Sequence, residues 1–142
     1  MATHLPAFRC DQSLRELRTG LESVQDAVAA ALAARGYDEG AMFAIRLAIE
    51  ESLVNAFRHG NRGDPNKSVF FRADIDEIRA VFEVQDQGPG FDPRAIPDPT
   101  EDENLEIPSG RGVMLIKAYM TEVEFVKPGN VLRMRYAKPS AP

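Results

Sequence analysis

The chain has 142 residues, about one domain, of which 44% are hydrophobic and 27% charged, a balance typical of globular proteins. It carries 17 Lys and Arg against 22 Asp and Glu, a formal net charge of −5, so no broad basic surface for nucleic acid is expected. The single cysteine, Cys10, cannot form a disulfide within the chain, which favours a reducing, cytoplasmic compartment. No apolar run reaches the roughly 18–20 residues of a membrane span, and no secretory signal is visible. The expectation is one domain over residues 1–142, without a membrane partner.

The N-terminal part of the chain predicts a short strand followed by a helix. Residues 4–10 are the candidate for the extended segment. Either Asp11 or Ser13 caps the helix, because Glu16 stands three residues after Ser13, the spacing of a capping box. The helix is rich in Ala and Leu and is predicted to end at Gly36.

A second helix is predicted from Asp38, as its N-terminal cap, to about His59. One of its sides is an ordinary core stripe, formed by Met42, Ile45, Ile49, Leu53 and Ala56. The other side begins with Ala44, Leu47 and Ala48 and then becomes polar at Glu51 and Asn55. These two polar residues are i, i+4 neighbours and share one surface spot. They mark either the exposed end of a helix or the edge of a pocket.

The middle of the chain predicts a β-hairpin over residues 68–75 and 78–85, because apolar residues alternate with period two. Asp76 and Glu77 form its turn. The apolar positions that share one face of the second strand are Ile78, Ala80, Phe82 and Val84.

The C-terminal part predicts a short helix over residues 113–120 and two strands over residues 122–126 and 131–136. Helices interspersed with hairpins favour a mixed, mostly antiparallel sheet covered on one face by helices. The fold class is therefore expected to be α+β, a two-layer α/β sandwich.

Residues 86–109 form a long loop without a periodic pattern, and loops of this length in small domains are generally lids, binding loops or disordered segments. Two glycine motifs border it, Asp86-Gln87-Gly88-Pro89-Gly90 and Gly110-Arg111-Gly112. Glycine lets the backbone approach a ligand closely or take a positive φ, and the start of a helix binds anions. Each motif taken singly is equally typical of an ordinary turn.

The three motifs in this order, E-x-x-x-N on a helix, D-x-G-x-G after a strand and G-x-G opening a helix, resemble the GHKL ATPase superfamily. Within it, residues 51–61 and the short chain are similar to the anti-sigma-factor serine/threonine kinases of bacterial partner switching. The resemblance covers roughly residues 6–136 and implies the Bergerat ATP-binding fold. No Walker motif and no H-E-x-x-H motif occurs in the sequence, so neither a P-loop enzyme nor a zincin is supported.

The resemblance implies a role for each matching residue. Asn55 would bind Mg²⁺ that bridges the phosphates of ATP, and Glu51 would be the general base toward a serine or threonine hydroxyl. Asp86 would accept a hydrogen bond from the adenine amino group. The other residues implied in nucleotide binding are Gly88, Gly90, Gly110, Arg111 and Gly112. Residues 91–109 would form the ATP lid, and His59 would either lie near the phosphates or cap its helix.

The leading interpretation is an ATP- and Mg²⁺-dependent serine/threonine protein kinase that is also an anti-sigma factor. As implied by the resemblance, it would phosphorylate an anti-anti-sigma antagonist and sequester a sigma factor. The alternative is a nucleotide-dependent binding module, an anti-sigma or adaptor protein without significant phosphoryl transfer. A histidine-kinase catalytic domain is a third candidate, disfavoured because no upstream dimerisation helices are seen. A homodimer is left open.

Overall fold

Five strands form one sheet in the order β1-β2-β3-β5-β4, and all four pairings between neighbouring strands are antiparallel. The computed structural model describes residues 5–88, 109–126 and 130–139. The strands are β1 (Phe8–Leu14), β2 (Val69–Ile75), β3 (Arg79–Gln85), β4 (Glu122–Val126) and β5 (Val131–Ala137).

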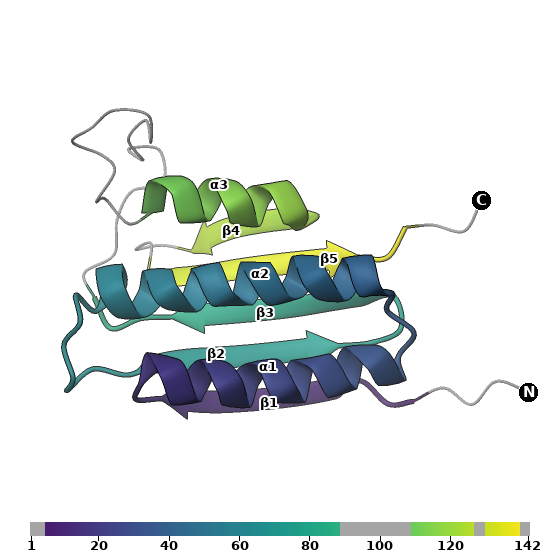
Figure 1. Ribbon diagram of the computed structural model, residues 1–142, viewed down its shortest axis with the longest axis horizontal. Coiled ribbons are helices and arrows are strands. Elements are labelled where there is room, and N and C mark those ends of the chain that lie inside the picture. Colours follow the sequence, from purple (N-terminus) through teal and green to yellow (C-terminus); the bar gives the residue numbers. More distant parts are fainter. Residues whose placement is uncertain (1–4, 89–108, 127–129, 140–142) are drawn as a thin grey trace, which may run out of the picture.

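Three helices cover one face of this sheet (Figure 1). They are α1 (Leu17–Ala34), α2 (Glu39–Asn55) and α3 (Ser109–Tyr119), and a single π-helical turn, η1 (Ala56–Gly60), continues α2. Because α2 lies between α1 and α3 and contacts both, it buries Ala44 and Ala48 as well as the predicted core stripe around Ile45 and Ile49. This position explains why α2 is apolar on two sides. The predicted α+β fold class with helices on one face is confirmed. The sheet was predicted to be mixed and mostly antiparallel, but all pairings between its described strands are antiparallel.

The core lies between the helices and the covered face of the sheet. Strand residues alternate between buried and more exposed positions along β2 and β3, the pattern of a sheet with one face in the core. Phe71 and Phe82 stack there with ring centroids 6.2 Å apart. Full burial of one such side chain stabilises the fold by roughly 1.5–3 kcal/mol. The largest fully buried aliphatic side chains include Leu32, Ile45, Ile49, Leu53, Ile75, Ile116 and Met134.

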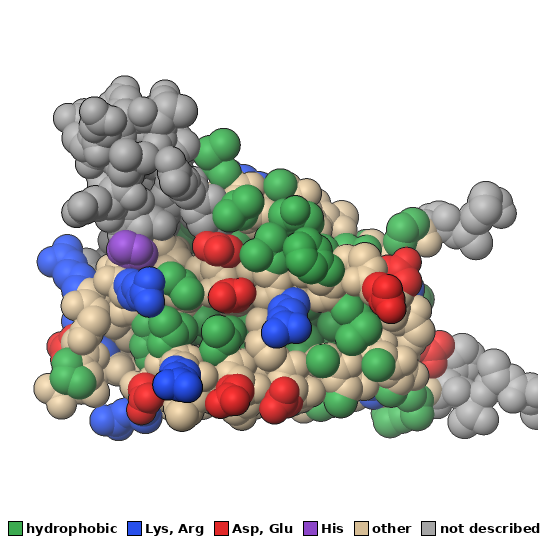
Figure 2. Space-filling view, viewed as in Figure 1, with side chains coloured by type: hydrophobic (Ala, Val, Ile, Leu, Met, Phe, Trp, Pro, Cys, Tyr) green, Lys and Arg blue, Asp and Glu red, His purple; other side chains and the backbone are tan. Residues whose placement is uncertain are grey.

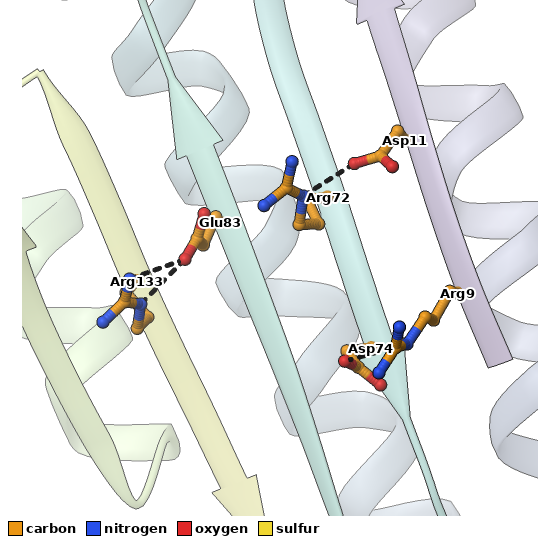
Figure 3. A network of polar contacts seen from close by, with 6 residues as sticks. All are labelled: Arg9, Asp11, Arg72, Asp74, Glu83 and Arg133. Atoms are coloured by element: carbon orange, nitrogen blue, oxygen red, sulfur yellow. Dashed lines mark hydrogen bonds and ion pairs between the residues drawn. The ribbon is translucent and has the colours of Figure 1, made fainter. Parts of the chain in front are cut away.

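The opposite face of the sheet carries paired charges (Figure 3). Arg72 contacts Asp11 at 2.7 Å, and Arg133 contacts Glu83 at 2.8 Å. The strand register places Asp11, Arg72, Glu83 and Arg133 in one row of alternating sign. Exposed ion pairs contribute only about 0–1 kcal/mol each. Their main consequence is that the row of residues across this face of the sheet is polar.

The prediction for the start of the first helix is wrong. Strand β1 continues through Asp11 to Leu14, where it pairs with Val69 of β2. Helix α1 begins only at Leu17, and Glu16 at its N-cap makes no side-chain capping bond. The ladder with β2 uses the backbone of residues 11–14, so Ser13 is not available as a helix cap.

Two other predicted boundaries are confirmed by their side-chain contacts. The carboxylate of Asp38 accepts a hydrogen bond from the Ala41 N–H at 2.8 Å and so caps α2. Asp76 forms the β2–β3 turn by accepting from the N–H groups of Ile78 and Arg79 at 2.7 and 2.8 Å. Ile78 was predicted to share the apolar face of the second strand, but it lies in this turn, before β3 begins, and is 72% exposed.

The beginning of α3 also differs from the prediction. The helix starts at Ser109 instead of Val113, so the Gly110–Gly112 motif lies within its first turn. Among the described residues, none of the helices has the length and hydrophobicity required to cross a membrane.

Candidate functional site

The three motifs meet at one end of the sandwich. Figure 1 shows that the C-terminal ends of α2 and β3 and the beginning of α3 all lie at the left-hand end. Helix α2 packs directly against α3, and the π turn after α2 contacts the turn after β3 through Gly60 and Asp86. Residues from distant parts of the sequence are thereby brought into one site.

Glu51 and Asn55 lie in the last turns of α2, and both side chains are half-buried. The Asn55 Oδ1 atom is buried and has no hydrogen-bond partner among the described residues. A buried oxygen left unpaired costs about 1–3 kcal/mol. An atom of this kind is suited to a hydrogen-bond donor or a cation supplied by a ligand.

Helix α2 does not stop at Asn55 but continues as the π turn η1. The Asn61 N–H bonds to the Ala56 carbonyl at 2.8 Å, five residues back, which is the π-helical spacing. Such turns are rare and occur frequently at functional sites. His59 lies in this turn, and its burial, with a smaller effect from Arg58, lowers the pKa of its imidazole. This shift favours the neutral imidazole, and the role of His59 stays a prediction.

Gly60 and Gly88 allow two backbone segments to touch. A Cβ added at Gly60 would overlap the carboxyl group of Asp86, and one added at Gly88 would overlap the Gly60 carbonyl oxygen. The described glycines with positive φ are Gly36 and Gly63. Gly88 is therefore required for close approach of the two backbone segments, and not for a positive φ.

This contact predicts that Gly88→Ala loosens the turn that holds Asp86. Overpacking of a tight site typically costs about 1–3 kcal/mol, so the free energy of unfolding should fall by that amount and ATP should bind more weakly. Urea denaturation and calorimetry measure the two effects. The matched control is Gly40→Ala in α2, where a Cβ would make only an ordinary 3.5 Å contact with Asp38. Equal stability of Gly88→Ala and wild type would contradict the close approach.

Asp86 has an unusual electrostatic environment. Burial raises the pKa of its carboxyl group, although the Gly88 N–H, which donates to Oδ1 at 2.8 Å, and the charge of Lys67 oppose this shift. A partly desolvated carboxylate forms stronger hydrogen bonds than one in water. Asp86 is therefore a strong acceptor for a donor group that enters the site.

Three residues whose role in the site was not predicted lie around Asp86: Gly60 next to its carboxylate, and Asn61 and Asn130 at the backbone of Asp86 and Gln87. Gly60 and Asn61 lie within residues 51–61, which carry the resemblance to the anti-sigma-factor kinases, but neither was assigned a contact with Asp86, and Asn130 was assigned no role in the site. Asn61 is 1% exposed, and its side chain accepts from the Gln87 N–H and donates to the Ser68 carbonyl. Asn130 bonds to the backbone of Asp86. Their types, common in turns, do not distinguish this role. Nothing in the sequence alone indicated that they meet.

The structure describes only some of the remaining predicted site residues. Gly90 and most of the proposed lid, residues 91–108, lie outside the described residues. Gly110, Arg111 and Gly112 are described only as part of the first turn of α3. The first four N–H groups of a helix have no partner within it, so this turn offers backbone donors toward the same end of the molecule.

Comparison with known sequence families matches residues 15–136 to the histidine kinase-like ATPase domain. Among curated proteins, none matches the chain significantly. The family match extends from before α1 into β5 and includes Glu51, Asn55, Asp86 and both glycine motifs. The antiparallel sheet with its covering helices is consistent with the Bergerat ATP-binding fold. The chain therefore belongs to the histidine kinase-like ATPase domain family of the GHKL superfamily, a membership that implies ATP binding.

Proposed function

We propose that this protein is an ATP-dependent serine/threonine protein kinase and anti-sigma factor whose substrate is an anti-anti-sigma antagonist. The observation that carries the proposal is the buried, unpartnered Oδ1 of Asn55, one helical turn after Glu51 and at the same end as Asp86. This arrangement would supply a metal ligand, a base and a hydrogen-bond acceptor for the nucleotide. The choice of substrate and the sigma partner rest on the resemblance described above.

The residues present fit a Mg²⁺ ion that binds together with the nucleotide. Among the described residues, no group of three or more His, Cys, Asp or Glu could hold a metal ion. A single amide oxygen from Asn55, together with phosphate oxygens and water, suits Mg²⁺, which keeps several waters and binds few protein ligands. When bound, Mg²⁺ would neutralise charge on the phosphates during transfer.

Glu51 is proposed to take the proton of the serine or threonine hydroxyl that receives the phosphoryl group, with ADP as the leaving group. Its carboxylate is half-buried and lies on the same side of α2 as Asn55. The base and the metal ligand are thus held by one rigid helix, which preserves their relative positions.

The nucleotide base is proposed to be recognised at Asp86, whose carboxylate would accept from the adenine amino group. Gly88 and Gly90 would form the adjacent wall. The first turn of α3, with Gly110, Arg111 and Gly112, would contact the phosphates through its backbone N–H groups.

Exposed apolar side chains on α2 and α3 favour a protein as the partner. Phe43 and Met114 are 59% and 58% exposed, and the Phe43 ring packs edge-on against Tyr119. Figure 2 shows hydrophobic side chains gathered over α3 and the neighbouring part of α2. Contiguous exposed apolar surface of this kind commonly marks a protein interaction site.

The test of the proposed function is capture of partners from the native cell in the presence of ATP or ADP. The captured proteins are then assayed for phosphoserine and phosphothreonine after incubation with ATP and Mg²⁺. Phosphorylation of a captured protein supports the kinase, whereas nucleotide-dependent capture without phosphorylation favours a binding module.

Asn55→Ala should weaken ATP binding in the presence of Mg²⁺ by at least about tenfold, because a direct metal ligand is lost and even outer-shell partners of a metal typically contribute this much. Calorimetry with Mg²⁺ and with EDTA should show that the variant has lost most of the affinity gained from the metal. The control is Asn66→Ala, which changes an exposed asparagine in the turn before β2. Unchanged Mg²⁺ dependence in Asn55→Ala would remove Asn55 from the metal site.

A further inference from the structure

The peptide unit that joins Asp86 to Gln87 is held on both sides by asparagine side chains. The Gln87 N–H donates to the Asn61 Oδ1 atom at 2.6 Å. The Asp86 carbonyl oxygen of the same peptide unit accepts from the Asn130 Nδ2 group at 3.1 Å. Asn61 stands at the end of the π turn and Asn130 directly precedes β5, so two separate elements hold one peptide plane.

Each asparagine is itself anchored. The Asn61 side chain is 1% exposed and donates through Nδ2 to the Ser68 carbonyl at 2.9 Å, and its own N–H completes the π turn at Ala56. The Asn130 carbonyl accepts from the Asp86 N–H at 3.0 Å. The N–H groups of Asp86, Gln87 and Gly88 are thus all bonded. Rotation of this turn would break several partly buried hydrogen bonds at once.

We infer that Asn61 and Asn130 are positioning residues that fix the Asp86 carboxylate and thereby determine selectivity for adenine over guanine nucleotides. This inference rests on the proposed role of Asp86 in the nucleotide site. The orientation of the peptide after Asp86 limits where its side chain points. Adenine presents an amino donor at the position where guanine presents a carbonyl oxygen, so a fixed carboxylate accepts from one and repels the other.

The experiment measures the affinities of ATP and GTP by calorimetry for wild type, Asn61→Ala and Asn130→Ala. Each variant should reduce the ATP-over-GTP preference by about tenfold, because each removes roughly one hydrogen bond that holds the peptide unit after Asp86. Loss of a residue that only stabilised the fold would weaken the binding of both nucleotides in the same proportion. The matched control is Ser52→Ala, which alters the other fully buried polar side chain of the described residues and should leave the preference unchanged.

A double variant tests whether the asparagines act through Asp86. In the Asp86→Asn background, Asn61→Ala should cause no further loss of preference, because the group that it positions is already changed. A further loss there, or an unchanged preference in both single variants, would overturn the inference. If Asn61→Ala does not fold, the half-buried Asn130 decides the question alone. Failure of the wild type to bind ATP would instead overturn the proposed nucleotide site.

Discussion

Glu51→Gln should slow phosphoryl transfer to a captured protein substrate by about 10²–10⁴-fold, the usual contribution of a general base. Glutamine keeps the size of the side chain and can form hydrogen bonds, but it cannot accept the hydroxyl proton. A loose transition state depends less on a base, which would place the loss toward the lower end of this range. Single-turnover transfer from labelled ATP measures the effect.

The neighbouring Glu50 provides a matched control. Glu50 is exposed and lies about 100° around α2 from Glu51. The Glu50→Gln variant should therefore transfer the phosphoryl group at the wild-type rate. ATP affinity should change little in either variant, because Asn55 and Asp86 are untouched. Equal transfer rates for Glu51→Gln and wild type would remove Glu51 from the mechanism.

Asp86→Asn should weaken ATP binding by about 10–100-fold, which corresponds to roughly 1.5–3 kcal/mol for a charge-assisted hydrogen bond. The preference for ATP over GTP should fall with it, because the amide can donate to the guanine carbonyl. Calorimetry with both nucleotides tests this. An unchanged preference would show that Asp86 does not read the base.

The same substitution should stabilise the empty protein at neutral pH. Burial raises the pKa of Asp86 above its ordinary value of 3.8 in the folded protein, so ionised Asp86 lowers the free energy of unfolding. The penalty is fully present above the folded pKa and disappears as the pH falls below 3.8. Melting temperatures of Asp86→Asn and wild type should therefore differ at pH 7 and converge in acid. A variant less stable than wild type at pH 7 would contradict this account.

Local patterns predicted most of the elements because their causes lie within a few residues. Asp38 caps α2 through an N–H three residues later, and Asp76 closes its hairpin through N–H groups two and three residues later. The predictions that were wrong depended on distant partners. Ser13 pairs with β2 and so does not form the predicted capping box. Ile78 lies in the turn and is exposed, so it does not share the apolar face of β3.

The sequence by itself determined the order of the elements, the sheet with helices on one face, and the motifs that contain Glu51, Asn55 and Asp86. These features follow from hydrophobic periodicity and from short spacings along the chain. Only the tertiary structure decided that Gly60 meets Asp86, and that Asn61 and Asn130 hold the peptide after it. These contacts join residues 26 and 44 positions apart. Their geometry depends on how the π turn, β3 and β5 pack together, which no local spacing specifies.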